Sequence, residues 1–390
     1  MSAKSAYVFV HGMFGWGDNE GINKKAPYWG ATCGSMMDFL RDNGYEVYAA
    51  SVGPISSAWD QACELYAQLA GVRVDYGERH SALHAHRRYG RIYTKPLFEG
   101  WSKVKKVHLI GHSFGGVVIR LLVHLLTYGA PEEVEKSGRD NVSPLFLGGQ
   151  EELVYSVTTL CTPLNGTSAY ETARKLRLLP LIKNGAIIYA GLLGRSKFNG
   201  NLVDFHLEHT GLTDTPGKRD REAWFGAFRS VAKNNDTIDY DISPVGSAKI
   251  NEYIKISKNV SYISYRFKAV REDKHDLPLD VRLPILFFTS VFMIADGKIT
   301  GDRSKIQNDG LVEVGVADYP HTEPHIKYEL GNEIKRGVWN VMPVMQGDHG
   351  AAIGLLANKE NTRQFYLDML KIISSTENQL ITSDEQNHLL

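Results

Sequence analysis

Apolar residues occur in short runs rich in β-branched and aromatic side chains, and this pattern predicts buried strands. The runs are AYVFV (6–10), YEVYAA (45–50), KVHLIG (106–111), LVYSVTTL (153–160) and SYISYRF (261–267). Segments with helical spacing separate the early runs, as in SMMDFLRDNG, where Met36, Met37 and Leu40 share one face and Gly44 ends the pattern. Alternating strands and helices predict an α/β fold with a mostly parallel sheet covered on both faces.

Two stretches interrupt this alternation, residues 54–105 and residues 165–250. The first contains an amphipathic helix and then a segment rich in histidine and arginine, and the second is long, mixed and partly helical. Both are too long to be plain connections, so we expect functional insertions in a single domain that spans residues 1–390. The polar residues 375–390 predict a disordered tail. The apolar run PILFFTSVFMIA, from Pro284, is too short to span a bilayer and indicates a buried or interfacial segment.

Composition excludes several classes of function. The 390 residues include 44 Lys and Arg against 44 Asp and Glu, so neither a nucleic-acid partner nor a membrane held by charge alone has electrostatic support. Cys33, Cys63 and Cys161 are too few and too scattered for a disulfide framework or a cysteine zinc site, and their odd number leaves at least one thiol free. No apolar signal-peptide core precedes the first predicted strand.

The most informative motif is Gly111-His112-Ser113-Phe114-Gly115, which fits the G-x-S-x-G nucleophile elbow of α/β-hydrolases. Its glycines permit a tight strand-to-helix turn that projects the serine hydroxyl above the sheet edge. The flanking runs, KVHLI before and GVVIRLLVHLL after, are the strand and helix that the motif requires. The alternative is a glycine-rich turn whose serine is satisfied by neighbouring groups and has no chemical role.

A nucleophilic serine needs a histidine and an acid, which follow it along the chain in this fold. His349 lies in the glycine-bracketed loop MQGDHGAA after the strand-like run GVWNVMPV, and Asp309 lies just before the strand-like run LVEVGVA. Asn-Asp-Gly is also a good turn sequence, so Asp309 has a second interpretation. Asp348 is a weaker candidate because neighbouring side chains in a loop diverge. The other late histidines are His321, His325 and His388.

Two backbone N–H groups are candidates for stabilising an oxyanion. The turn places the N–H of Phe114 at the start of a helix, and the loop after the first strand, His11-Gly12-Met13, offers the N–H of Met13.

Three histidines within seven residues, His80, His84 and His86, raise the question of a metal. Asp60 lies upstream on a predicted helix. It could join two of these histidines on zinc, which accepts imidazole and carboxylate in tetrahedral geometry. Alternatively, Asp60 stands three residues after Ser57 and could complete a capping box and nothing more.

Together these segments resemble the thermoalkalophilic bacterial lipases, bacterial lipase family I.5. The resemblance runs over most of residues 6–350, and the stretch from Trp59 to Gly90 is its most distinctive part. It rests on the segments HGMFGWG, YWG, VGPISSAWDQACELYAQLAG, VDYG, GHSFGG, NVSPLF, SVTTLCTPLNGT, QNDG and GVWN.

The resemblance implies a role for each matching residue. It implies Ser113 as nucleophile, His349 as base and Asp309 as acid, with Met13 and Phe114 as oxyanion donors through their backbone. It also implies a structural zinc that ties the first insertion to the second, and His84 is then not a ligand. The implied zinc ligands are Asp60, His80, His86 and Asp236, with Asp239 and Asp241 as nearby alternatives for the last.

This chain departs from the family at several positions. The family often has alanine where Gly111 stands and glutamine where Phe114 stands, and both changes preserve the backbone role. Calcium is not expected, because Ala351 and Leu356 occupy the places of the family's calcium-binding glutamate and aspartate. The segment AYETARKLRLLPLIKNGAIIYAGLLG (169–194) corresponds to a helical lid, although a helical pair buried permanently over the sheet would give a similar pattern.

The resemblance therefore predicts a secreted lipase that hydrolyses triacylglycerols, other water-insoluble esters and, as a further hypothesis, polyesters at an oil–water interface. Two alternatives stay open. One is an esterase or thioesterase that acts on small soluble acyl substrates, since a triad does not determine the leaving group. The other is a non-catalytic lipid-binding scaffold.

Overall fold

The computed structural model describes residues 5–175, 203–210, 235–271 and 276–387, with side chains up to Glu377. Its centre is a seven-stranded sheet in the order β2-β1-β5-β6-β7-β10-β9, and every pairing in this sheet is parallel. The five strand predictions from the sequence each coincide with a strand of this sheet. The strands are β1 (Ala6–Val10), β2 (Glu46–Ala50), β5 (Val107–His112), β6 (Val154–Leu160), β7 (Ser261–Tyr265), β9 (His325–Lys327) and β10 (Trp339–Val341).

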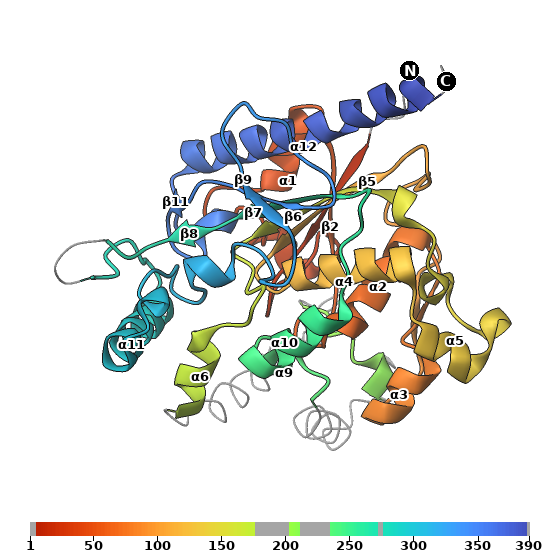
Figure 1. Ribbon diagram of the computed structural model, residues 1–390, viewed down its shortest axis with the longest axis horizontal. Helices are drawn as coiled ribbons and strands as arrows, with labels where there is room; N and C mark the ends of the chain where they lie inside the picture. The colour runs from red at the N-terminus through yellow and green to blue at the C-terminus, as the bar shows by residue number, and fades with distance from the viewer. Residues whose placement is uncertain (1–4, 176–202, 211–234, 272–275, 388–390) are drawn as a thin grey trace.

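Helices cover both faces of the sheet, as predicted (Figure 1). Helices α2 (Ala58–Ala70) and α4 (Gly115–Tyr128) pack on one face, and α1 (Met36–Asp42) and α12 (Lys359–Asn387) pack on the other. Because both faces are covered, strands such as β1 and β5 are buried along their whole length and read as continuous apolar runs rather than alternating ones. The mostly parallel α/β fold is therefore confirmed.

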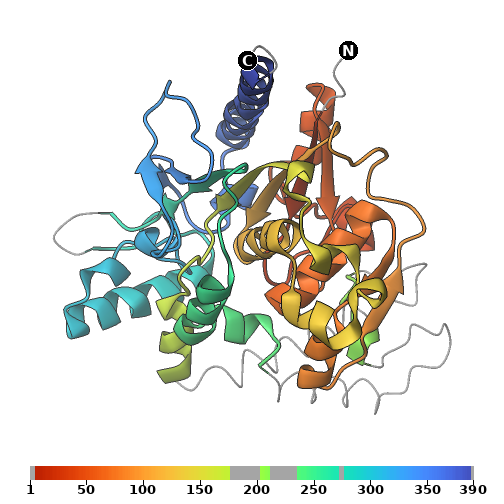
Figure 2. The same cartoon turned by 45° about the vertical axis from the view of Figure 1, so that its right-hand side comes forward.

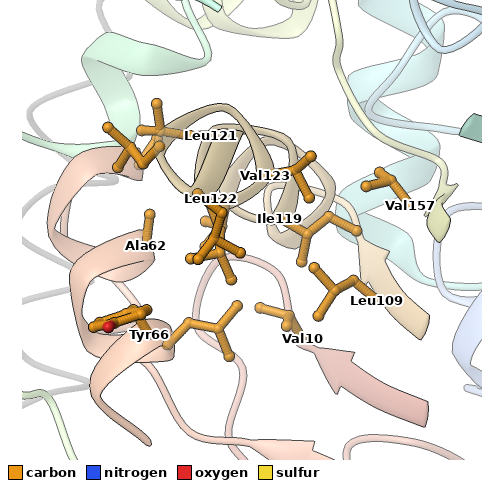
Figure 3. Close-up of a cluster of buried hydrophobic side chains, with 14 of the residues drawn as sticks. Val10, Ala62, Tyr66, Leu109, Ile119, Leu121, Leu122, Val123 and Val157 are labelled. Carbon is orange, nitrogen blue, oxygen red and sulfur yellow. The ribbon is translucent and has the colours of Figure 1, made fainter. Parts of the chain in front are cut away.

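The larger core lies where α4 is held between the sheet and α2 (Figure 3). Ile119 and Leu122 of α4 lie toward Val10 and Leu109 of the sheet, while Tyr66 of α2 closes the cluster from the far side. Almost every residue of α4 is buried, and its buried side chains are apolar apart from Arg120 and His124. The β5–α4 turn that it follows is thereby fixed in place.

The insertion of residues 54–105 is built on α2. Ser57 caps this helix by accepting the N–H of Asp60 at 3.2 Å, and Gly71, at φ 67°, ends it in the left-handed conformation. After α2 come the antiparallel pair β3 (Arg73–Asp75) and β4 (Tyr89–Ile92), with the short helix α3 (Glu78–His84) between them.

The second insertion, residues 165–250, is described only in part. Its described helices are α6 (Ser168–Lys175), α9 (Ile238–Asp241) and α10 (Pro244–Tyr253). The expected lid segment, 169–194, begins in α6, but residues 176–202 lie outside the described residues. The remaining described elements outside the 3-10 turns are α5 (Pro131–Ser137), α11 (Pro284–Thr300) and the parallel pair β8 (Phe267–Lys268) and β11 (Met345–Gln346).

Three segments differ from the sequence-based expectation or refine it. The run after Asp309 forms a 3-10 turn at Val314–Val316 instead of a strand. Helix α12 continues through Asn387, where we expected a disordered tail from residue 375. Thr376 is buried and Glu377 contacts His108 beneath the helix at 2.9 Å, so the helix is still packed against the sheet at these two residues. The apolar run from Pro284 forms α11. No helix among the described residues is long and apolar enough to cross a membrane.

We expect Leu122→Ala to lower the free energy of unfolding by about 2–5 kcal/mol, because Leu122 is fully buried between the sheet and α2 and its loss leaves a cavity. Val104→Ala removes an apolar side chain that is 81% exposed and should change stability by less than about 0.5 kcal/mol. Urea denaturation followed by circular dichroism measures both. Equal stability of the two variants would contradict the packing described for α4.

Candidate active site and metal cluster

The turn between β5 and α4 holds Ser113 in a strained backbone conformation. Its φ is 53°, in the left-handed region that non-glycine residues rarely adopt, and its N–H donates to the carbonyl of Leu160 at 2.8 Å. Glycines make the turn possible, since a Cβ on Gly111 would lie 2.4 Å from the backbone of Gly115, and one on Gly115 would lie 2.3 Å from the carbonyl oxygen of Val10. The Ser113 side chain is only partly buried, so the turn presents its hydroxyl.

Asp309 and His349 come together although they are 40 residues apart in the chain. The Nδ1 atom of His349 lies 2.8 Å from Oδ2 of Asp309, and the His349 backbone N–H also donates to the Asp309 carbonyl at 2.8 Å. The other carboxylate oxygen of Asp309 accepts the N–H groups of Leu311 and Val312 at 2.9 and 2.8 Å. The carboxylate is therefore fully buried, hydrogen-bonded through both oxygens, and aimed at the imidazole.

Asp348, the alternative acid, is used differently. Its two oxygens accept the backbone N–H groups of Arg282 and Ala351 at 2.8 and 2.9 Å. Burial raises the pKa of Asp348, and these two hydrogen bonds oppose that rise. The side chain thus supports the backbone of the His349 loop, and Asp309 alone reaches the ring.

A hydrogen-bonded chain joins the Ser113 turn to the loops on both sides of it. The Gly12 N–H donates to the hydroxyl of Tyr28 at 2.9 Å, and that hydroxyl lies 2.7 Å from Nδ1 of His112. The other ring nitrogen, Nε2, lies 3.0 Å from the carbonyl oxygen of His349. Because a carbonyl oxygen only accepts, Nε2 carries the proton and Nδ1 accepts from Tyr28. Burial lowers the pKa of His112 well below its usual value, and neighbouring His349 adds to the effect, which keeps this tautomer neutral.

The loop after β1 lies directly beside Ser113, because a Cβ on Gly12 would come within 2.7 Å of the Ser113 Cβ. His11 holds this loop: its Nδ1 donates to the Gly12 carbonyl, and its Nε2 accepts the Val52 N–H at 3.2 Å. Burial lowers the pKa of His11 to about 4, so it too stays neutral.

The backbone N–H groups of Met13 and Phe114 make no hydrogen bond within the described part of the chain. Phe114 is itself 1% exposed and Met13 half-buried. Two unused amide donors beside a strained serine form a site suited to a developing negative charge.

The other late histidines lie elsewhere. His321 and His325 are exposed, and the ring of His325 stacks on Tyr319 with centroids 3.5 Å apart. His388 lies outside the described residues. Cys161, which directly follows β6 and has a φ of 52°, is buried close to His112 and His349, and burial raises the pKa of its thiol well above the usual value. Cys33, Cys63 and Cys161 are all free.

A second cluster gathers ligand atoms from both insertions. It consists of Asp60 of α2, His80 of α3, His86 after α3, and Asp236 before α9. The Nε2 atom of His80 lies 3.2 Å from Asp60 Oδ1 and 3.3 Å from Asp236 Oδ2, and Nε2 of His86 lies 3.4 Å from Asp236 Oδ2. These separations match the edge of a tetrahedron whose centre is about 2.0–2.1 Å from each ligand, which is about 3.3 Å and is typical of zinc.

The electrostatics of this cluster favour a cation at its centre. Asp60 is 1% exposed, and its Oδ1 and the Nε2 atoms of both histidines have no well-aligned hydrogen-bond partner among the described residues. Burial lowers the pKa of His80, but interactions with the Asp236 and Asp60 carboxylates outweigh it and raise the value to about 10. Two buried carboxylates therefore attract positive charge to this point, and the orphaned atoms that converge there fit a metal.

Surrounding residues orient the ligands. The ring of Trp59 stacks on that of His80 with centroids 5.1 Å apart, and Nδ1 of His86 donates to the Arg87 carbonyl at 2.9 Å. Buried Glu133 accepts the N–H groups of Arg79 and His80 at the start of α3.

The fourth position of the cluster belongs to Asp236 rather than to its neighbours. Asp241 accepts the Ala58 N–H at 2.8 Å and so caps α2, and burial raises its pKa to about 7. Asp239 is not in the cluster. His84 is also outside it, although its ring lies against that of His80. Ser57 caps α2 as a capping box would, yet the Asp60 side chain joins the histidines, so each of the two sequence interpretations describes part of the arrangement.

Sequence reasoning missed three residues. Tyr28 and His112 link the turn to its neighbours, and His209 places Nε2 at 3.4 Å from the second Asp60 oxygen. His112 was visible inside the G-x-S-x-G motif, whereas the contacts of Tyr28 and His209 join segments too distant in the chain for any local pattern.

Comparison with known proteins gives the family. The family model described as "Lipase-like, C-terminal domain" matches residues 3–386. The chain belongs to this family. It is 35% identical to a lipase of Staphylococcus hyicus over 365 residues, which is 90% of this chain and 54% of that protein, and 33% identical to Lipase 2 of Staphylococcus aureus over 90% and 50%. The chain thus spans about half the length of these relatives, and the resemblance to bacterial lipases is confirmed.

Three solved structures share the fold. The crystal structure of Staphylococcus hyicus lipase superposes with a TM-score of 0.82 at 31% identity, covering 97% of each chain. EstA from Clostridium botulinum gives a TM-score of 0.78 at 30% identity, covering 96% of this chain and 88% of that one. Lipase 1 from Pelosinus fermentans gives 0.74 at 30% identity, covering 97% and 99%.

We expect Tyr28→Phe to lower kcat/KM for a nitrophenyl ester by about tenfold, because the Gly12 N–H and His112 Nδ1 lose their shared hydrogen-bond partner. The loop after β1 and the β5–α4 turn are then no longer held in alignment. The matched control is Tyr262→Phe. Its buried hydroxyl also accepts a backbone N–H, that of Ser257 at 3.0 Å, but outside this site. Both variants should lose similar thermal stability. Equal kcat/KM in the two variants would show that the Tyr28 hydroxyl does not support the reaction.

Proposed function

We propose that this chain is a lipase that hydrolyses water-insoluble carboxylic esters through a Ser113–His349–Asp309 triad. The observation that carries the proposal is the 2.8 Å contact between His349 Nδ1 and buried Asp309, together with the hydrogen bond from His112, the residue before the strained Ser113, to the His349 carbonyl. The lipase names of the relatives, of which the chain spans about half the length, support the same chemistry.

Each residue of the proposed site has a defined role in the reaction. Nε2 of His349 accepts the hydroxyl proton as Ser113 Oγ attacks the ester carbonyl, and Asp309 accepts from Nδ1 and stabilises the imidazolium. The Met13 and Phe114 amides donate to the oxyanion. His349 then protonates the departing alcohol, leaving an acyl-serine. Water, deprotonated by His349, attacks this ester, and the acid leaves as the proton returns to Ser113.

The substrate class is the part of the proposal for which alternatives remain. A soluble ester or thioester would satisfy the same triad, and so a panel of short- and long-chain nitrophenyl esters, emulsified triolein, an acyl thioester and a polyester film separates them. A non-catalytic scaffold is opposed by the buried, hydrogen-bonded Asp309–His349 pair, which an inactive protein has no reason to keep. The proposal includes a secreted enzyme, in keeping with the similarity to bacterial lipases.

We also propose that Asp60, His80, His86 and Asp236 bind a structural zinc ion. Two histidines and two carboxylates suit zinc, and four protein ligands leave no open position for a catalytic water. When bound, the metal neutralises the two buried carboxylates. It would hold the first insertion to the part of the second that contains Asp236, so its contribution is to the shape of the domain and not to the reaction.

Exchange of the acid tests the triad. We expect Asp309→Asn to lower kcat for a nitrophenyl ester by about 10⁴-fold, because an amide cannot hold the imidazole in the required tautomer or stabilise its charge. Ser113→Ala should abolish turnover to a similar or greater extent. The measurement is steady-state hydrolysis at saturating substrate.

The matched control is Asp348→Asn, which alters the neighbouring carboxylate and its two backbone hydrogen bonds but not the contact with the ring. It should lower kcat by less than about tenfold. Larger losses from Asp348→Asn than from Asp309→Asn would reverse the assignment of the acid.

Metal analysis tests the zinc site. Protein purified without chelators should contain about one equivalent of zinc, and its removal should lower the melting temperature by roughly 10 °C, as expected for a tightly bound stabilising ion. Asp236→Asn and His80→Ala should lose both the zinc and the added stability, and His84→Ala, a neighbouring histidine outside the cluster, should keep both. Zinc well below one equivalent in the wild type, or equal retention in all variants, would refute the site.

A further inference from the structure

Helix α11 exposes apolar side chains that nothing in the described structure covers. Of its 17 residues, the outward ones are almost all apolar, and three are aromatic or large aliphatic groups more than half exposed: Ile285 at 71%, Phe288 at 61% and Ile299 at 84%. Phe287, Val291 and Phe292 add exposed fractions of 38%, 37% and 41%. From Leu283 to Ala295 the helix contains no charged residue.

The inner face of α11 is apolar in part but is fastened by polar groups. Fully buried Ser290 donates to the Asn308 side chain at 2.7 Å, and Asp296 forms ion pairs with Lys175 of α6 and Lys305 at 2.8 and 2.7 Å. Leu286, Met293 and Ile294 are buried on the same inner face, so α11 is apolar on both sides, whereas an ordinary surface helix is polar on its outer side. A helix whose exposed side is apolar is expected to contact an apolar medium or another protein molecule.

The helix is clamped to both loops that contain the proposed acid and base. Asn308, which binds Ser290, directly precedes Asp309, and Gly310 lies against Leu286, where an added Cβ would be 2.9 Å from the leucine Cβ. Just before the N-terminus of the helix, the N–H of Arg282 donates to Asp348, next to His349. Figures 1 and 2 show α11 at the periphery beside α6, away from the central sheet.

The size of the exposed face indicates what covers it. A helix of this length is about 26 Å long, and one side of it offers roughly 260 Å² for a width of about 10 Å. A stable dimer buries about 800 Å² on each partner, three times as much. A helix that lies in a lipid surface needs only one apolar side of this size, whose phenylalanine and aliphatic residues insert among the acyl chains.

We propose that α11 is a fixed docking surface that inserts Ile285, Phe288 and Phe292 into the acyl-chain region of a lipid surface, distinct from the lid expected at residues 169–194. The inference rests on the proposed ester hydrolysis, since docking serves a site that acts on lipid. Because α11 is tied to the Asp309 and His349 loops, docking sets the orientation of the active site to the surface without a movement of the helix.

The test compares two double variants in a Ser113→Ala background, so that turnover is not needed to measure binding. Ile285→Ser with Phe288→Ser removes two outward side chains of α11. The control, Val104→Ser with Leu330→Ser, removes two side chains that are 81% and 88% exposed outside α11. Binding to phosphatidylcholine vesicles and to a triolein emulsion is measured by flotation, and folding by circular dichroism.

We expect the α11 variant to bind at least roughly tenfold more weakly than Ser113→Ala alone, because each inserted side chain gains about 1.5–3 kcal/mol on burial, and the control to bind normally. With Ser113 restored, the α11 variant should hydrolyse soluble nitrophenyl butyrate like the wild type and lose activity on the emulsion. Unchanged binding, or a wild-type dimer in sedimentation that the α11 variant abolishes, would overturn the inference. Absence of any ester hydrolysis by the wild type would instead refute the proposed function, and the binding result would still stand.

Discussion

The arrangement of the site depends on one close approach of backbone to backbone at the β5–α4 turn. Ser113 has a positive φ, and the Gly115 backbone lies so near β1 that a single methyl group would collide with it. Such strain persists only when the surroundings enforce it. Here a fully buried helix, α4, is held between the sheet and α2, and the serine N–H is tied to β6. Core packing thus stabilises the strained turn, and the turn presents the Ser113 hydroxyl at the carboxyl edge of the sheet.

The neutral histidine in that turn, His112, holds three loops in alignment through its hydrogen bonds. His112 joins Tyr28, and through it Gly12, on one side and the His349 backbone on the other. A charged imidazole would have to donate from both nitrogens, which would leave the tyrosine hydroxyl without an acceptor. Burial, by depressing the pKa of His112, keeps the ring in the one protonation state that satisfies all its neighbours.

The sequence was sufficient for five strands of the sheet, because parallel strands buried on both faces form continuous apolar runs such as AYVFV. It also gave Ser113, Asp309 and His349 as a set, and resemblance to a family gave the four residues that gather in the metal cluster. Tyr28 was missed because its contact with His112 spans 84 residues. The extent of α12 beyond residue 375 could not be read from composition, which does not reveal that Glu377 has a buried partner, His108. The run after Asp309 was misjudged because β-branched residues favour strands only where a neighbouring strand is free to pair.

The metal cluster stands out beside the three cysteines, which are all buried and unpaired. Asp60 and Asp236 lie in different insertions, and a shared ion would close a loop between them in the way a disulfide closes one, by restricting the unfolded chain. Such a cross-link does not respond to thiols or oxidants. The environmental variable that sets the stability of this fold would then be the free concentration of a metal ion, and the redox potential of the surroundings would have no influence on it.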